Sequence, residues 1–297
     1  MHFILYLNKL ISMKALYLYS DKTGLSRPKN YQENIIRKLS GSYELTAKAT
    51  SSQDEFISEC KNAISNGYEV VIISGGDGTF NMGCSAIASL PKEKRPIIGY
   101  VPTGTCNDSA KTLGIKGVRK AIKLLKKKDV IDYDICKVND QYFTFVCAIG
   151  QYADIAYITE RREKKHFGRL SYYRIAIKEA FQKKKVHAVV ECNNNKYEVI
   201  TPFVLVMSGS NVGGFKVNFK KSYNDGLFDI YLTKPGLFNG LLHYLFFKAR
   251  TLHLKTSAAK IHTDQVGEWC IDGERGMKGD VEIECLKSHL RVIGLKK

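Results

Sequence analysis

Two glycine-rich stretches carry residue types that can hold a phosphate group. The first, Ser74-Gly75-Gly76-Asp77-Gly78-Thr79, follows the apolar run Val70–Ile73 and precedes a helical pattern from Phe80 to Leu90. Backbone N–H groups of a glycine-rich turn and of a helix N-terminus attract anions, and glycine lets a ligand approach the backbone. No Gly-Lys-Ser/Thr follows, so this is not a Walker P-loop. A tight turn between a strand and a helix is the alternative.

The second stretch repeats this order of features. The run Pro96–Val101 has the composition of a buried strand and ends in Pro102-Thr103-Gly104-Thr105-Cys106-Asn107-Asp108, after which the pattern is helical. The carboxyl ends of parallel strands share one edge of an α/β sheet, and ligands bind in the crevice there. Asp77 adds a carboxylate that can bind a hydroxyl group or a metal-bound water. The residues expected to cradle phosphate in that crevice are Gly75, Gly76, Gly78, Thr79 and Thr105.

A third motif, Asp272-Gly273-Glu274, lies near the C-terminus and contains two carboxylates. Phosphoryl transfer needs a phosphate cradle, a cation and a carboxylate that orients or deprotonates the attacking hydroxyl group. Carboxylates two residues apart on an extended strand point to the same side. Their repulsion would raise the pKa of one of them toward a value that suits a base. An ordinary exposed turn is the alternative.

The three motifs together resemble those of the diacylglycerol kinase catalytic family: GGDGT at Gly75–Thr79, PTGTCND at Pro102–Asp108, and Asp272-Gly273-Glu274. That family includes bacterial lipid kinases and the sphingosine and ceramide kinases, with the NAD kinases more distant. The resemblance extends from about Met13 to the end of the chain. It implies an ATP- and Mg²⁺-dependent enzyme that transfers the γ-phosphate to the hydroxyl of diacylglycerol or a similar lipid, giving phosphatidic acid, at a site between two domains.

The resemblance also implies roles for individual residues. Glu274 is the expected proton acceptor, with Asp272 second and Asp77 as a further catalytic carboxylate. Some family members bind Mg²⁺ at a later turn, where this chain offers the Asp225 carboxylate and the carbonyls of Ser222 and Leu227. The residues expected to bind the nucleotide are Ser20, Thr23, Gly24, Thr50, Gly75, Gly76, Asp77, Gly78, Thr79, Asn81, Thr105, Asn107 and Asp108.

The chain departs from the family pattern at three places. Ser20-Asp21 replaces Asn-Pro, Met82 replaces a glutamate, and Asn224 replaces an aspartate of the metal turn. One alternative is therefore a catalytically silent protein that binds nucleotide or docks on membranes. Another is a kinase of a different acceptor, such as another lipid, a sphingoid base, NAD or a soluble polyol. For Thr50 the alternative is helix capping, and for Asp225 it is a plain Asp-Gly turn.

Hydrophobic periodicity divides the chain into two parts. Strands and helices alternate up to about residue 130, whereas strand follows strand from Ile131 onward, with a hairpin turn at Asn193-Asn194-Asn195. With the resemblance, this pattern predicts an α/β fold. We expect a Rossmann-like three-layer nucleotide-binding domain at residues 13–130 with about 288–297, and a mainly antiparallel β-sandwich domain at residues 131–287. Residues 1–12 are expected to be an N-terminal extension or a segment that touches a membrane.

Charge and cysteine content limit the partners and the compartment. The 46 basic and 29 acidic residues give a net charge of +17, which suits an anionic membrane, an anionic substrate or nucleic acid. No nucleic-acid-binding motif is present, so we expect no nucleic acid, and the resemblance implies a lipid substrate at an anionic membrane surface. The eight cysteines form no CxxC pair, which indicates reduced thiols and no transition-metal site.

Two segments are candidate membrane contacts. They are the basic run Lys126-Lys127-Lys128 and the apolar stretch Leu237–Leu254. A solvated helix end and a core helix are the respective alternatives. No apolar run approaches the roughly 20 residues that span a bilayer. We therefore expect a cytoplasmic protein that is peripheral to the inner face of the membrane, and the sequence leaves a homodimer open.

Overall fold

The structure is a computed structural model that describes residues 13–21, 30–151, 185–212, 215–216, 222–234, 251–264 and 267–295. Thr23 and Gly24, which are predicted nucleotide contacts, lie outside the described residues, as does the predicted N-terminal extension. The pattern of contacts within the chain divides it into two compact units. Unit 1 comprises Met1–Tyr133 with His289–Lys297, and unit 2 comprises Asp134–Ser288. Two strands, β5 (Val130–Val138) and β18 (Val281–Ile293), run from one unit into the other.

A parallel sheet forms the centre of unit 1, with the strand order β2-β1-β3-β4 followed by the C-terminal end of β18. The strands are β1 (Lys14–Ser20), β2 (Glu44–Thr50), β3 (Val70–Gly75) and β4 (Ile97–Pro102). Every residue of β3 and β4 is buried, as expected of parallel strands that are covered on both faces. Their register pairs Gly75 with Pro102, so both glycine-rich turns begin at the same edge of the sheet.

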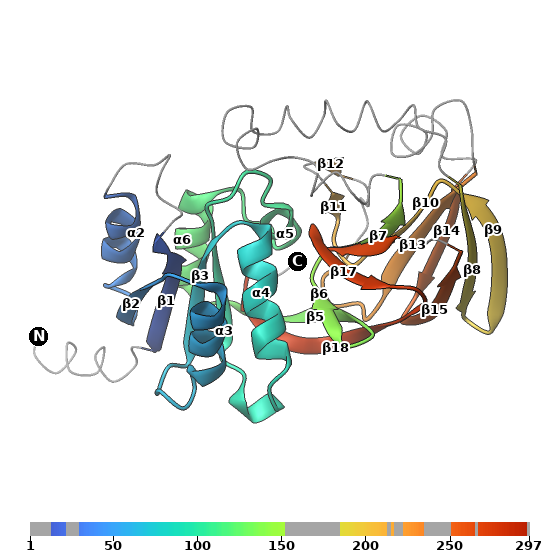
Figure 1. The fold of residues 1–297 in the computed structure, drawn as a ribbon. Coiled ribbons are helices and arrows are strands. Elements are labelled where there is room, and N and C mark those ends of the chain that lie inside the picture. The colour runs from blue at the N-terminus through green and yellow to red at the C-terminus, as the bar shows by residue number, and fades with distance from the viewer. Residues whose placement is uncertain are drawn as a thin grey trace, which may run out of the picture. The chain divides into compact units, whose positions relative to one another are not determined.

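Helices cover both faces of this sheet. The helices are α2 (Tyr31–Leu39), α3 (Gln53–Asn62), α4 (Asp77–Ala88), α5 (Asp108–Thr112) and α6 (Val118–Lys127), with a short 3-10 helix at Lys92–Lys94. Apolar side chains of α2 and α6 share a core with Tyr17, Val70 and Ile72 of the sheet. The next residue, Ile73, faces the other way toward α4, and α3 and α4 lie side by side (Figure 1). Helix, sheet and helix therefore form three layers.

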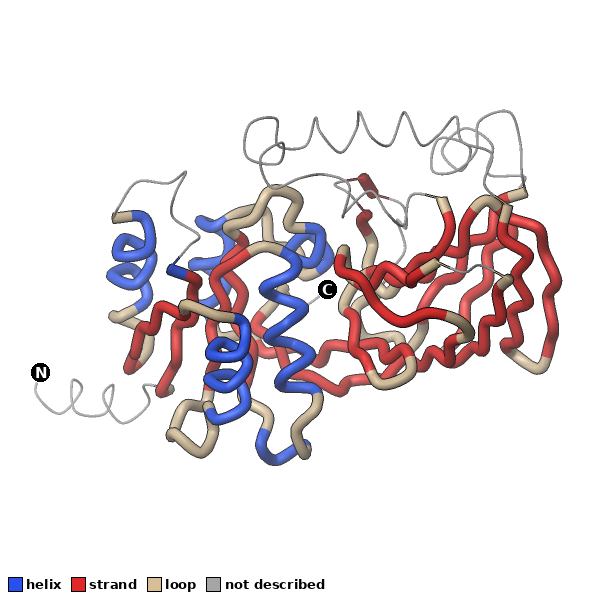
Figure 2. Tube along the Cα trace, in the orientation of Figure 1, coloured by secondary structure: helices blue, strands red, loops and turns tan. Residues whose placement is uncertain are grey.

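Unit 2 is built from strands alone within its described residues (Figure 2). One sheet contains the N-terminal part of β18, then β15, β8 and β9, with the hairpin of β5 and β6 also attached to β18. The second sheet has the order β14-β13-β10-β7-β16-β17 with antiparallel neighbours, and β11 and β12 form a small separate pair. The strands not yet bounded are β6 (Gln141–Phe143), β7 (Val146–Gly150), β8 (Val186–Cys192), β9 (Asn195–Thr201), β10 (Phe203–Met207), β11 (Asn211–Val212), β12 (Phe215–Lys216), β13 (Phe228–Thr233), β14 (Thr251–Thr256), β15 (Ala258–Thr263), β16 (Glu268–Ile271) and β17 (Glu274–Lys278).

Side chains from both sheets of unit 2 form one continuous core. Its largest fully buried members are Trp269, Phe143 and Phe228. The indole N–H of Trp269 donates to the carbonyl of Gly279 at 2.9 Å, so the polar atom of this side chain is satisfied inside the core. Alternating burial along β8 places Val186, Ala188 and Val190 on the core side. The β-sandwich expected for this part of the chain follows from this two-sided packing.

The structure adds detail to three local features. Strand β18 bends at Ser288, where φ is 51°. The Asp134 carboxylate accepts a hydrogen bond from the N–H of Ser288 at 2.7 Å and thereby holds this bend. The last residues of the apolar stretch Leu237–Leu254, for which a core helix is the alternative, lie in strand β14. The hairpin turn is Asn193-Asn194, with φ of 50° and 60°, and Asn195 already pairs with Cys192.

Candidate active site

The two glycine-rich turns of unit 1 approach each other through bare backbone. The N–H of Thr103 donates to the carbonyl of Gly75 at 2.8 Å. A Cβ atom on Gly104 would lie 2.5 Å from the Cα of Gly76, a distance at which the backbone would have to shift. Glycine is therefore required at Gly104 for this close approach. The result is a cradle in which the backbones of the two turns meet at the carboxyl edge of the sheet, and exposed backbone N–H groups of such turns can accept phosphate.

Asp77 connects the two motifs directly. As the first residue of α4, it accepts a hydrogen bond from the N–H of Ser109 at 2.8 Å. Burial raises the pKa of the Asp77 carboxyl above its ordinary value, the hydrogen bond from Ser109 opposes this, and the negative charge of Asp108 adds to the increase. Asp108 is buried and forms an ion pair with Lys111 at 2.7 Å. These predicted residues are thus brought together, with Asp77 held by the N-terminus of α5.

Asn107 folds the second turn back on itself. Its side-chain oxygen accepts from the N–H of Gly104 at 3.0 Å, and its side-chain N–H₂ donates to the carbonyl of Gly104 at 2.8 Å. The residue has a left-handed backbone with φ of 52°, which asparagine tolerates better than most residues. The structure therefore gives Asn107 a role in shaping the turn, while its predicted contact with the nucleotide stays a prediction.

The other predicted nucleotide contacts of unit 1 lie along the same edge. Ser20 and Thr50 are paired at the ends of β1 and β2, and the Thr50 hydroxyl donates to the carbonyl of Tyr19 at 3.3 Å. The Thr79 side chain packs on Gly75, where an added Cβ would lie 2.4 Å from the Cβ of Thr79. Gly78, Asn81 and Thr105 lie in the first turns of α4 and in the second glycine-rich turn.

Sequence reasoning missed two polar groups beneath this edge. The Tyr100 ring, on β4, stacks on Phe80 at 4.3 Å between ring centroids, and its hydroxyl donates to the carbonyl of Gly75 at 3.4 Å. The Gln32 side chain, on α2, accepts hydrogen bonds from the hydroxyls of Tyr17 at 2.6 Å and Ser74 at 3.3 Å. Tyr100 had no distinguishing signal because it lies in an apolar run, and Gln32 is far from its partners in the sequence.

The Asp272-Gly273-Glu274 motif of unit 2 forms a hairpin turn and not an extended strand, which corrects the expected geometry. Asp272 and Gly273 have φ of 48° and 91°, and they connect Ile271 to its pairing partner Glu274. Glu274 begins β17 and is exposed. Asp272 is buried, and burial raises the pKa of its carboxyl to about 7 against the opposing effect of its hydrogen bonds.

The predicted metal turn already contains a positive charge. The Lys255 ammonium lies 2.8 Å from Oδ2 of Asp225, while Oδ1 accepts from the N–H of Leu227 at 3.2 Å. The Ser222 hydroxyl donates to the side-chain oxygen of Asn224 at 2.8 Å. No cluster of three His, Cys, Asp or Glu side chains suited to a metal occurs among the described residues. The only carboxylate in the predicted ligand set is thus paired with a lysine, whose ammonium group competes with a metal ion for this turn.

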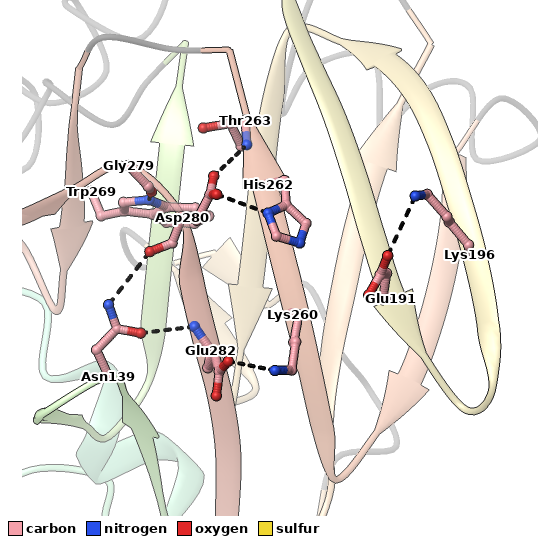
Figure 3. Close-up of polar contacts among 10 residues, drawn as sticks. All are labelled: Asn139, Glu191, Lys196, Lys260, His262, Thr263, Trp269, Gly279, Asp280 and Glu282. Carbon is pink, nitrogen blue, oxygen red and sulfur yellow. Dashed lines mark hydrogen bonds and ion pairs between the residues drawn. The ribbon is translucent and has the colours of Figure 1, made fainter.

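A groove of about 830 Å³ in unit 2 lies apart from all predicted site residues. Its charged side chains pair with one another across strands, as Lys260 does with Glu282 at 2.6 Å and Lys196 with Glu191 at 3.4 Å (Figure 3). Asn139 adds a hydrogen bond to the N–H of Glu282 at 2.8 Å. This mutual pairing is typical of a solvated sheet surface, so we assign no ligand to the groove.

Comparison with known proteins shows which family the chain is similar to. Residues 14–138, which contain both glycine-rich turns, match the model of the diacylglycerol kinase catalytic domain. Over nearly its whole length the chain is similar to diacylglycerol kinases. A diacylglycerol kinase of Bacillus subtilis strain 168 is 26% identical over 292 residues, covering 94% of this chain and 96% of the relative. One from Staphylococcus carnosus strain TM300 is 27% identical over 290 residues and covers 94% of each. These similarities support a lipid kinase.

Solved structures agree with this similarity. A diacylglycerol kinase from Bacillus anthracis strain Sterne has a TM-score of 0.78 at 26% identity, covering 95% of this chain and 97% of that one. An NAD kinase from Archaeoglobus fulgidus, solved in complex with ATP, has a TM-score of 0.52 at 11% identity and shares the fold. The predicted α/β fold class with a second, antiparallel unit is confirmed. Among the described residues, no helix has the length and apolar character that a membrane span requires.

Proposed function

We propose that this protein is an ATP-dependent kinase that transfers the γ-phosphate to the hydroxyl of diacylglycerol, or of a similar lipid, to give phosphatidic acid. The observation that carries the proposal is the close approach of Gly76 and Gly104, where a Cβ on Gly104 would lie 2.5 Å from the Cα of Gly76. A cradle of bare backbone at the carboxyl ends of β3 and β4 suits the phosphates of a nucleotide. The hydrogen bond from Ser109 to Asp77 keeps both turns in one arrangement.

Each unit contributes to the proposed reaction. In unit 1, the turns at Gly75–Thr79 and Pro102–Asp108 bind and orient the triphosphate, and the Thr79 and Thr105 hydroxyls supply further donors. Mg²⁺ bound to the triphosphate would supply positive charge that offsets the negative charge developing during transfer. In unit 2, exposed Glu274 accepts the proton of the attacking lipid hydroxyl. Positioning and electrostatics account for most of the rate in this type of reaction, so the glycine cradle matters as much as the base.

The basic charge supports a partner surface that is anionic. Helix α6 has no acidic residue in its first turn, and Arg119, Lys123, Lys126 and Lys127 on it are exposed. Each basic side chain close to an anionic leaflet contributes about 1 kcal/mol to binding. We therefore propose that the protein works in the cytoplasm, at the inner face of the membrane where its lipid substrate lies. Equal binding to neutral and anionic vesicles in a flotation assay would contradict this part of the proposal.

A radiolabelled transfer assay tests the function. The wild-type protein would be incubated with labelled ATP, Mg²⁺ and mixed micelles of diacylglycerol, monoacylglycerol or sphingosine, and with NAD in a parallel reaction. Label in phosphatidic acid, absent with Asp77→Ala, is the expected result. Label in another acceptor would show that the protein is a kinase but that its substrate is not diacylglycerol. If ATP bound without transfer to any acceptor, the departures at Ser20-Asp21, Met82 and Asn224 would favour a silent nucleotide-binding protein.

A further inference from the structure

Three consecutive backbone N–H groups converge on the side chain of Asp272. Oδ2 accepts from the N–H of Thr144 at 2.6 Å and from its hydroxyl at 2.8 Å. Oδ1 accepts from the N–H of Phe145 at 3.0 Å and of Val146 at 2.8 Å. In return, the N–H of Asp272 donates to the carbonyl of Val146 at 2.8 Å. The residue is buried, so this buried carboxylate holds the whole loop between β6 and β7.

The same loop is also bound by the Ser208-Gly209 turn that follows β10. The carbonyl of Phe145 accepts from the N–H of Ser208 at 3.1 Å and of Gly209 at 3.3 Å, directly after β10. Strand β7 lies between β10 and β16 in the second sheet of unit 2. Loop 144–146 therefore connects the Ser208-Gly209 turn to the hairpin that carries Glu274, and the Asp272 carboxylate is its attachment to that hairpin.

We propose that Asp272 is a positioning residue that fixes the orientation of Glu274 by clamping loop 144–146 to the hairpin turn. This inference rests on the proposed function, in which Glu274 accepts the proton of the lipid hydroxyl. Asp272 and Gly273 both adopt the left-handed backbone conformations that a two-residue Asp-Gly hairpin turn uses. The hydrogen bonds of Asp272 attach this turn to loop 144–146, and Glu274 follows at once as the first residue of β17.

The geometry separates Asp272 from the role of proton acceptor. A base needs an oxygen within hydrogen-bond reach of the substrate hydroxyl. Each Asp272 oxygen already takes two protein donors, and the side chain is buried, whereas Glu274 is exposed. Asp272 therefore acts through Glu274 and does not replace it.

Hydrogen exchange of the full-length protein tests the clamp without any activity measurement. In Asp272→Asn the side chain keeps one acceptor oxygen. Its N–H₂ group faces backbone N–H donors, with which it forms no hydrogen bond. The amides of Thr144, Phe145 and Val146 should then exchange about tenfold faster or more, because net hydrogen bonds near 1 kcal/mol each are lost. Thr144→Val removes only the hydroxyl contact and should give a smaller increase in the exchange rate. If Asp272→Asn does not fold, Thr144→Val takes its place in the test. Glu274→Gln should leave these amides unchanged. Unchanged exchange in Asp272→Asn, or in Thr144→Val if that variant must serve, would overturn the clamp.

Kinetics then test whether Asp272 acts through Glu274. We expect Asp272→Asn to lower kcat by about tenfold or more with little change in KM for ATP, and Glu274→Gln to lower kcat further. The double variant Asp272→Asn with Glu274→Gln should be no slower than Glu274→Gln alone. Once residue 274 cannot accept a proton, its orientation has no further effect on kcat. High activity in Glu274→Gln with none in Asp272→Asn would make Asp272 the base and overturn the proposal. If the wild type transfers no phosphate at all, the proposed function fails, while hydrogen exchange still decides the clamp.

Discussion

The ammonium of Lys255 lies 2.8 Å from Oδ2 of Asp225, at the turn where the sequence predicts Mg²⁺. The hydrogen bond to Asp225 raises the pKa of Lys255 above its ordinary value, so the lysine stays charged across the neutral range. Lys255 of β14 pairs in register with Asp229 of β13. Asp225 lies in the turn just before β13, so the pairing of these two strands brings Lys255 close to it. The chain thus carries its own cation at this turn.

The first prediction is that Mg²⁺ does not stabilise this turn in the wild-type protein. Without nucleotide, the melting temperature should be the same in Mg²⁺ and in EDTA. Lys255→Met exposes the Asp225 carboxylate to solvent ions and should make the melting temperature rise with Mg²⁺. Lys260→Met, which breaks the ion pair with Glu282 on another strand, is the matched control and should gain no such dependence. A Mg²⁺-dependent rise in the wild type that Asp225→Asn abolishes would show that the turn holds the metal.

The second prediction concerns the close approach of Gly104 to Gly76. In Gly104→Ala the new Cβ would lie 2.5 Å from the Cα of Gly76, so one turn must move. We expect a loss of about 1–3 kcal/mol in the free energy of unfolding and weaker ATP binding, measured by urea titration and calorimetry. Gly41→Ala is the control, because a Cβ there meets nothing within 4 Å. Unchanged ATP affinity in Gly104→Ala would show that the nucleotide does not bind at the contact between these two turns.

The third prediction separates the structural and chemical roles of Asp77. Asp77→Asn keeps an oxygen that can accept from the N–H of Ser109, whereas Asp77→Ala leaves that donor unpaired. The alanine variant should lose about 1–3 kcal/mol of stability and the asparagine variant much less. Both should lose kinase activity by about a hundredfold or more, since both remove the carboxylate that is expected to bind a hydroxyl group or a metal-bound water at the phosphate site. Near-normal activity in Asp77→Asn would limit Asp77 to holding the turns together.

The sequence was sufficient for the parts of the site that are local. Each glycine-rich stretch follows a buried apolar run, and parallel strands end at the same edge, so the pattern alone places Gly75 close to Pro102. The hairpin at Asp272-Gly273 was also within reach, because Asp-Gly between two strands is a strong signal for a two-residue turn. The expectation of an extended strand there gave too little weight to that signal.

The rest depends on contacts between residues far apart in the chain. Asp272 binds Thr144, and Lys255 binds Asp225 from a strand whose first residues belong to a candidate membrane contact. No periodicity or motif encodes such pairs, because they arise from the order of strands in the second sheet. Tyr100 is similar, since its stacking on Phe80 depends on how α4 packs over β4.

The fourth prediction concerns the pH dependence of stability. Burial raises the pKa of Asp272 from 3.8 to about 7, so the folded protein holds this proton more tightly than the unfolded chain does. The contribution of Asp272 to the free energy of unfolding should then be greatest near pH 4 and should fall as the pH rises to about 7, by up to about 1.4 kcal/mol per pH unit. Above about pH 7 it should be constant.

Urea unfolding of the wild type and of Asp272→Asn across this range checks the prediction, because only the wild type carries the titrating group. The difference between the free energies of unfolding of the wild type and of Asp272→Asn should decrease as the pH rises. Burial raises the pKa of the neighbouring Cys147 thiol well above its ordinary value, so Cys147 stays neutral throughout and does not confuse the comparison. A constant difference between the two proteins would mean that the four hydrogen bonds to the carboxylate offset the cost of burying its charge.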